Sequence, residues 1–378
     1  MLNRSFLCSW ADDTFQHFVH KGDQPKRVQS ADVIKLLAVI CITVFIILGN
    51  VFCLFVLNSR RTRRHLPMAS RMLMTSLACT DCSMGVFVTS LSAYPAIHGC
   101  WPFGDSICMW QAFMLSALFH ESTLSLTLIA VDRYMAVSHP LRYQTFVSKR
   151  MVIGLIITSW ILCFLVYGII VIGFGLYYYD MVAMNCEPEY SNSEMTTSVL
   201  VIFYLFPTVL IVVCYFRLYR AAQAHRQYLQ HNGFECVRVR ETTASTGHLR
   251  ATRTLAIVTM GFFVAVTPWT LTQLLMTLTQ SPVPELVDFT VTWVAISNSF
   301  WNTIIYLVSS TSYRKAACQV LGRARRACGI STCSRRTQRR DYIRRQLQQS
   351  QLALCGTAAI TDPPQRPDKE EEITELTV

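Results

Sequence analysis

Long runs of apolar residues, separated by short polar segments, recur along most of this chain. A helix needs roughly 20 apolar residues to cross the hydrocarbon core of a bilayer, because hydrocarbon offers no partner to free backbone groups. Seven stretches meet that requirement: 33–57, 69–93, 108–134, 151–173, 195–219, 252–278 and 286–309. The pattern predicts an all-α membrane protein, a bundle of seven transmembrane helices.

Two of these runs are unusually polar. The third contains His120, Glu121 and many Ser and Thr residues, so we expect its neighbours to enclose it most completely. The seventh has the weakest hydropathy of the set.

Basic residues are confined to alternate connectors between the runs. The first, third and fifth connectors and the C-terminal tail carry Lys and Arg, whereas the intervening connectors have neither. Cytoplasmic connectors of membrane proteins are enriched in these residues. We therefore expect an extracellular N-terminal segment at 1–32, a transmembrane domain at 33–309 and a cytoplasmic C-terminus.

Composition supports the membrane interpretation. Of 378 residues, 52% are hydrophobic and only 15% are charged, whereas an average soluble chain has about 25% charged residues. The net charge of +11 resembles that of a nucleic-acid-binding protein, but the basic residues lie in short blocks between apolar runs. We therefore expect no nucleic-acid partner.

Two of the fifteen cysteines occupy distinctive positions. Cys108 begins the third run on the outer face, and Cys186 lies in the outer connector after the fourth. An oxidising compartment permits a disulfide between them, which would hold that connector over the mouth of the bundle. Cys8 and Cys100 are also outside, and whether they pair is left open.

Other segments carry candidate modifications. The sequon at Asn3 would lie outside, where it is either glycosylated or unused. Cys318, Cys328 and Cys333 follow the last run in a basic segment, where they are either palmitoylated or plain thiols.

Short motifs occur in a fixed order along the runs. They are Gly49-Asn50, Leu77-Ala78-Cys79-Thr80-Asp81, Trp101-Pro102-Phe103-Gly104, Asp132-Arg133-Tyr134, Pro140-Leu141, Trp160, Pro207, Tyr215, Phe262, Pro268 and Asn302-Thr303-Ile304-Ile305-Tyr306. Over roughly residues 33–322 the chain resembles the rhodopsin-like (class A) G-protein-coupled receptors, near the amine-receptor branch and some orphan receptors. The resemblance implies a plasma-membrane receptor that is not an enzyme and that activates a heterotrimeric G protein by conformational change.

The resemblance also implies roles for individual residues. The activation switch would comprise Asp132, Arg133, Tyr134, Tyr215, Phe262, Pro268, Asn302 and Tyr306. The carboxylate of Asp81 lies in mid-membrane, where such a group is a functional hypothesis by default. It would bind an allosteric sodium ion with Ser122, Asn298, Ser299 and Asn302, or else serve as a hydrogen-bonded structural group.

Several positions depart from the family pattern. The third-run Asp that holds the ammonium of an amine ligand is Leu115 here, so a standard biogenic amine is not expected. The seventh run has no Lys for a retinal Schiff base, which excludes an opsin. Val266 replaces the sixth-run Trp and Thr303 replaces the seventh-run Pro.

The sixth run also lacks an acid that would restrain Arg133. No acidic residue occurs between Thr242 and Thr279. Loss of one restraint on a closed state shifts the population toward the open state. We therefore expect ligand-independent signalling.

The ligand, a small molecule or peptide of unknown identity, is expected in the outer half of the bundle. Candidate contacts are Met114, Leu115, His120, Trp269, Gln273 and Trp293. Adjacent helical residues point about 100° apart, so at most one of His120 and Glu121 faces the cavity. The alternative is that both are satisfied within the core.

Beyond the last run we expect a short amphipathic eighth helix at 310–322 on the lipid surface and a disordered tail at 323–378. The terminal Leu376-Thr377-Val378 fits a PDZ-type partner. A channel or transporter would show internal repeats, and an intramembrane enzyme would show a metal or nucleophile motif. The sequence has neither.

Overall fold

The computed structural model describes residues 29–190, 193–231, 235–279, 281, 283–309 and 311–327. The sequon at Asn3, the cysteines Cys8, Cys328 and Cys333, and the terminal Leu376-Thr377-Val378 lie outside the described residues. The modifications and the PDZ-type contact expected there stay predictions.

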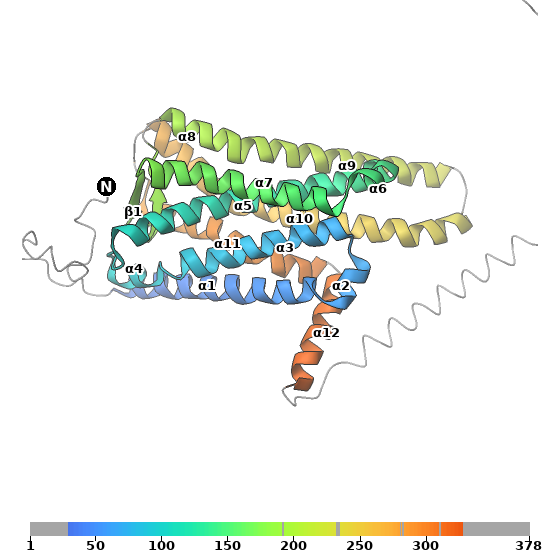
Figure 1. The fold of residues 1–378 in the computed structure, drawn as a ribbon, viewed down its shortest axis with the longest axis horizontal. Helices are drawn as coiled ribbons and strands as arrows, with labels where there is room; N and C mark the ends of the chain where they lie inside the picture. The colour runs from blue at the N-terminus through green and yellow to red at the C-terminus, as the bar shows by residue number, and fades with distance from the viewer. Residues whose placement is uncertain are drawn as a thin grey trace, which may run out of the picture.

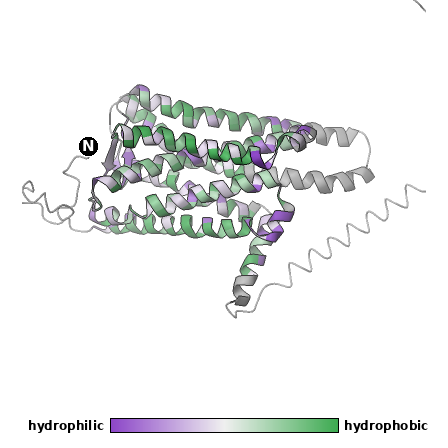
Figure 2. Ribbon diagram, viewed as in Figure 1, coloured by the Kyte–Doolittle hydropathy of each residue, from purple (hydrophilic) through white to green (hydrophobic). Residues whose placement is uncertain are grey.

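Long helices run alongside one another and form a bundle (Figure 1). They are α1 (Ser30–Leu57), α3 (Met68–Met84), α5 (Gly104–Ser138), α7 (Lys149–Tyr167), α8 (Ser193–Leu200), α9 (Phe206–His231), α10 (Glu235–Thr279) and α11 (Glu285–Ser309). Three π-helical segments extend them: η3 (Gly85–Thr89) follows α3, η4 (Gly168–Gly173) follows α7, and η5 (Val201–Leu205) joins α8 to α9. The predicted all-α bundle is confirmed, and the long helices consist largely of hydrophobic residues (Figure 2).

Six of the helical stretches in the described chain are long and apolar enough to cross a membrane. The helix α11 falls below that threshold because it carries Ser297, Asn298, Ser299 and Asn302. These side chains are buried, and α11 packs against α10, α1 and α3. Its polar face is therefore covered by other helices rather than exposed to lipid.

The most enclosed helix is α5. In its most apolar window 78% of the residues are buried, against 28% in α1, and α5 contacts α3, α7, α9 and both strands. Its Ser and Thr hydroxyls are largely satisfied within the helix; Ser116 and Thr127, for example, donate to carbonyls four residues earlier. The enclosure predicted for the third run is confirmed.

A β-hairpin crosses one end of the bundle. Strands β1 (Tyr177–Asp180) and β2 (Asn185–Pro188) pair antiparallel. The predicted disulfide between Cys108 and Cys186 is present, with Cα atoms 5.3 Å apart. The backbone N–H of Cys186 also donates to Gln111 Oε1 at 2.7 Å. The hairpin is therefore fixed to the start of α5.

The tip of the hairpin is attached to α11. The carboxylate of Asp180 accepts hydrogen bonds from the backbone N–H groups of Val182 and Ala183, which shapes the turn. The indole N–H of Trp293 donates to the carbonyl of Ala183 at 3.0 Å. Cys100, near the same end, is disulfide-bonded; its proposed partner Cys8 lies outside the described residues.

Short helices complete the bundle: α2 (Arg60–His65), α4 (Ala93–His98), α6 (Pro140–Phe146) and α12 (Thr311–Ala327). Tyr313, Ala316 and Ala317 of α12 are buried, while Arg314 and Cys318 are exposed. This spacing is that of an amphipathic helix. The helix α12 ends at Ala327, five residues beyond the end predicted at 322.

We predict that Gly85→Ala destabilises the protein. A Cβ atom there would lie 2.6 Å from Ile47 Cγ1 and 2.9 Å from Ile46 Cγ2 on α1. Overpacking of this kind costs about 1–3 kcal/mol, so the thermal midpoint of the purified protein should fall. The control is Gly154→Ala, where nothing lies within 4 Å of the new Cβ. Equal midpoints for the two variants would contradict the close packing of α1 on η3.

Candidate functional site

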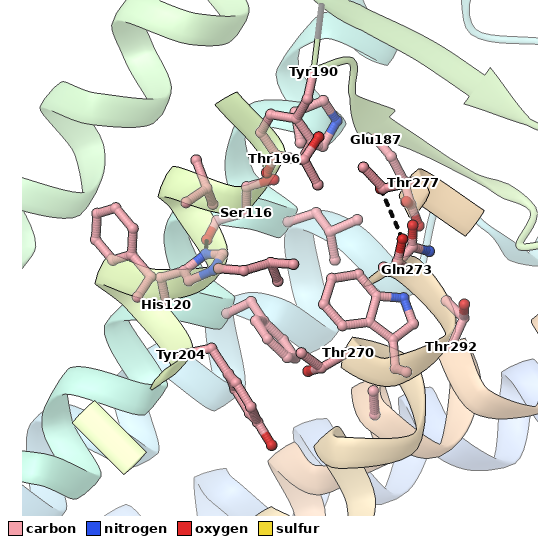
Figure 3. Close-up of a pocket in the computed structure, with 18 of the residues that line it drawn as sticks. Ser116, His120, Glu187, Tyr190, Thr196, Tyr204, Thr270, Gln273, Thr277 and Thr292 are labelled. Carbon is pink, nitrogen blue, oxygen red and sulfur yellow. Dashed lines mark hydrogen bonds between the residues drawn. The ribbon is translucent and has the colours of Figure 1, made fainter. Parts of the chain in front are cut away.

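A cavity of about 550 Å³ lies under the hairpin. Residues of α5, the hairpin, α8, η5, α10 and α11 line it. Figure 3 shows Ser116 and His120 on one side of the cavity and Glu187, Gln273, Thr277 and Thr292 on the other. The volume falls within the range of about 300–1,000 Å³ that is typical of small-molecule sites.

Four of the six predicted contact residues line this cavity: Leu115, His120, Trp269 and Gln273. The other two do not. Met114 is buried in the hydrophobic cluster with α7 and η4, because it is turned about 100° from Leu115 around the helix axis. Trp293 is buried beneath the hairpin tip, where Met184 and Phe289 contact the same cluster.

His120 both lines the cavity and has its hydrogen bonds satisfied. Its Nδ1 lies 2.8 Å from the carbonyl of Ser116, to which it donates, and its Nε2 accepts from the hydroxyl of Tyr167 at 3.3 Å. The His120 ring also stacks on Tyr167, with centroids 5.0 Å apart. The ring is therefore a fixed part of the cavity wall.

Glu121 points away from the cavity, toward α7. Its Oε1 accepts hydrogen bonds from Ser159 of α7 at 3.0 Å and from Ser125 at 3.2 Å. Only one of the adjacent pair His120 and Glu121 faces the cavity, as the helical geometry predicts.

Acidic residues gather at the hairpin side of the cavity. Glu187 and Glu189 line it, and Glu187 is only 8% exposed. Burial, and then the negative charges of Asp180 and Asp288, raise the pKa of Glu187 to about 8. The sequence analysis did not predict Glu187 and Glu189 as cavity residues. The connector that carries them has acidic residues but no Lys or Arg, which could have indicated an acidic site.

At the opposite end of the bundle Arg133 is held by an ion pair. Its guanidinium lies 2.5 Å from Asp132 Oδ2 and also donates to Ser70 Oγ of α3. The Ser70 hydroxyl donates to Asp132 Oδ2 at 2.7 Å, and the Tyr143 hydroxyl of α6 donates to Asp132 Oδ1 at 2.7 Å. Within the described part of the chain, the hydrogen-bond partners of Arg133 thus come from α3 and α5 and none from α10.

Tyr134, Tyr215, Phe262 and Tyr306, four further predicted switch residues, are not joined to Arg133 in one hydrogen-bond network. Tyr215 accepts a hydrogen bond from Thr259 of α10 at 3.2 Å, while the buried hydroxyl of Tyr306 has no partner among the described residues. Phe262 packs in the same hydrophobic cluster as Tyr306. Tyr134 has its ring against His139, with centroids 6.0 Å apart.

The positions that depart from the family pattern are packed or hydrogen-bonded. Val266 is fully buried in the core cluster shared by α10 and α3. The hydroxyl of Thr303 donates to the carbonyl of Gly49 at 3.2 Å, which joins α11 to α1. Pro268 lies inside α10.

Polar side chains surround Asp81 in the middle of the bundle. Asn302 Nδ2 donates to Asp81 Oδ2 at 2.9 Å, and Ser122 Oγ lies 3.4 Å from Oδ1. The side-chain oxygens of Asn298 and Asn302 are buried and have no partner in the described chain. Ser299 contributes its carbonyl to Asn50 at 2.8 Å.

A helical bundle that crosses the membrane, with a covered cavity at one end and an Asp–Arg pair at the other, defines a multi-pass membrane receptor. The family model of the 7 transmembrane receptor (rhodopsin family) matches residues 49–306. The chain belongs to this family.

Curated relatives agree with that assignment. Trace amine-associated receptor 7d of Mus musculus is 28% identical over 287 residues, which cover 72% of this chain and 78% of the relative. Trace amine-associated receptor 7a of Rattus norvegicus has the same identity and coverage. Probable G-protein coupled receptor 21 of Homo sapiens is 26% identical over 311 residues, 79% of this chain and 86% of the relative.

We predict that the stability of the receptor falls as pH rises toward 8. The folded-state pKa of Glu187, about 8, lies above its ordinary value of 4.5. The folded state therefore binds more protons than the unfolded state between these pH values, and deprotonation destabilises it. Thermal midpoints of the purified receptor between pH 5 and pH 8 should show this slope.

The matched control is Glu187→Gln, which keeps the shape of the side chain and removes the ionisation. This variant should show a flatter pH dependence. A slope identical to that of the unmodified receptor would contradict the assignment to Glu187.

Proposed function

We propose that this receptor transmits an extracellular signal to heterotrimeric G proteins through Arg133. The hairpin end would face outside, because the connectors at that end contain no Lys or Arg. The observation that carries the proposal is the buried Asp132–Arg133 pair at the opposite end. A buried Arg that exchanges one set of partners for another is a two-state element, which a ligand can bias.

The resting state of this element would be weakly restrained. Arg133 is held by its neighbour Asp132 and by the neutral hydroxyl of Ser70. Hydrogen bonds between charged groups are roughly twice as strong as neutral ones, and α10 carries no acid between Thr242 and Thr279. The receptor would therefore signal appreciably without ligand.

The ligand would not be a standard biogenic amine. Leu115 lines the cavity at the position of the family's ammonium-binding Asp, and a cation buried against it would lack a counter-charge. The trace amine-associated receptors among the relatives therefore do not by themselves identify the ligand of this chain.

A sodium ion would fit the site around Asp81. The unpartnered oxygens of Asn298 and Asn302 and the Ser122 hydroxyl are hard donors suited to such a cation. Asp81, Ser122, Asn298, Ser299 and Asn302 would hold it. The ion would supply positive charge that stabilises the buried carboxylate.

We predict that Arg133→Ala lowers the second-messenger output of cells that express the receptor without ligand. Output of cAMP or inositol phosphate should exceed that of mock-transfected cells and fall to the mock level in the variant. The control is Arg142→Ala, because Arg142 is exposed on α6 and makes no side-chain contact with the ion pair. Output at the mock level from a well-expressed unmodified receptor would contradict ligand-independent signalling.

We also predict that Ser70→Ala raises basal output. The change removes a hydroxyl that bonds both Asp132 and Arg133 and so frees the pair to change partners. A net loss of about 1 kcal/mol corresponds to an increase of about fivefold in the population of the active state. The control is Thr75→Ala on the same helix, whose hydroxyl bonds only the carbonyl of Arg71. An output equal to that of the control, at matched surface expression, would show that Ser70 does not restrain the switch.

A further inference from the structure

Two carboxylates, Glu187 and Glu189, line the mouth of the cavity. Glu187 lines the cavity, and Asp180 and Asp288 lie close enough to affect its ionisation. Among the described residues, no Lys or Arg lines the cavity. Lys35 of α1 lies over the ring of Phe289, 5.3 Å from its centroid, and forms no ion pair with another described residue.

Polar atoms at the same place lack partners. Asn185 lines the cavity and is fully buried beside Glu187; apart from that carboxylate, its side-chain oxygen and nitrogen have no hydrogen-bond partner in the described chain. Oδ1 of Asp288 is also buried without a partner. An unsatisfied buried polar group is costly, and each instance calls for an explanation. A bound polar ligand would supply the missing partner.

The backbone that carries these groups is fixed. Asn185 and Glu187 flank Cys186, which is bonded to Cys108 and hydrogen-bonded to Gln111. Their positions relative to α5 are therefore set before any ligand arrives. Such preorganisation reduces the ordering cost of binding.

Aromatic rings complete the mouth. Tyr178 and Tyr190 line the cavity beside the acidic residues, and Figure 3 shows Tyr190 at the hairpin side. Carboxylates together with aromatic faces attract organic ammonium groups. The described chain contains no group of three or more His, Cys, Asp or Glu residues suited to a metal ion.

We propose that the acidic mouth, composed of the cavity-lining residues Tyr178, Asn185 and Glu187 with Asp288 close to Glu187, binds the cationic group of an organic ammonium ligand. The apolar part of this ligand lies deeper, against Phe119 and Trp269, whose rings are 5.6 Å apart. The ligand thus presents its charge to the hairpin rather than to Leu115 of α5. This inference rests on the proposed function, since it takes the cavity as the receptor's ligand site.

The test measures binding to the purified full-length receptor by the rise of its thermal midpoint with ligand concentration. The probes are phenylbutyl-trimethylammonium, whose charge does not titrate, and its neutral analogue with carbon in place of the quaternary nitrogen. The charged probe should bind at least about tenfold more tightly. Glu187→Gln should weaken it about 30-fold or more, as expected when one member of a buried charge pair is removed.

Glu194→Gln is the matched control. Glu194 is exposed in the first turn of α8 and does not line the cavity, so this variant should bind like the unmodified receptor. Without a probe and above pH 8, where the Glu187 carboxyl is ionised, Glu187→Gln should melt at the same or a higher temperature, because it removes an unpaired buried charge. A lower midpoint would instead indicate a structural role.

The proposal is overturned by equal binding of the two probes, by full binding to Glu187→Gln, or by the absence of any shift up to millimolar probe. The readout does not involve a G protein. Failure here, with second-messenger output that still depends on Arg133, would therefore reject the acidic mouth and leave G-protein coupling intact.

Discussion

The bilayer imposes the constraint on which the rest of this structure depends: a polar group inside the bundle must find its partner inside the bundle. This constraint explains the place of α5, which carries more buried polar side chains than a lipid-facing helix tolerates and is enclosed on all sides. As a result, several residues with structural or candidate functional roles lie on the single helix α5. Along α5 lie the disulfide to the hairpin, His120 on the cavity wall, Ser122 beside Asp81, and Arg133.

The departures from the family pattern are consistent with the same constraint, because each replacement still satisfies its surroundings. Thr303 donates to the carbonyl of Gly49, and Val266 fills a buried position in the core cluster. At Arg133, the partner that α3 contributes is the neutral hydroxyl of Ser70. Hydrogen bonds between charged groups are roughly twice as strong as bonds to neutral groups, which is why the proposed resting state would be weakly restrained.

Most of the fold was predictable from the sequence, because hydropathy and loop charge are local signals. The third run was predicted at 108–134 and the helix spans Gly104–Ser138. The cavity was predicted less well. Met114 and Trp293 face packed clusters, and Glu187, which lines the cavity, was not among the predicted contacts. Which side chain reaches a cavity depends on helix rotation and on how the hairpin folds back, and neither is encoded in local periodicity.

The location of negative charge has consequences for how a signal would cross the bundle. A carboxylate at position 115 of α5 would hold the charge of a ligand directly against that helix. The side chain at this position is the apolar Leu115. The acidic groups instead lie on a hairpin that is bonded to α5 through Cys186 and Gln111 and to α11 through Trp293. A ligand group bound to the hairpin would be linked to α5 through the disulfide and to α11 through the hydrogen bond of Trp293. Because α5 continues without a break to Arg133, a small displacement of the hairpin would act on the helix that carries the proposed switch, with no ligand charge needed in the core of the membrane.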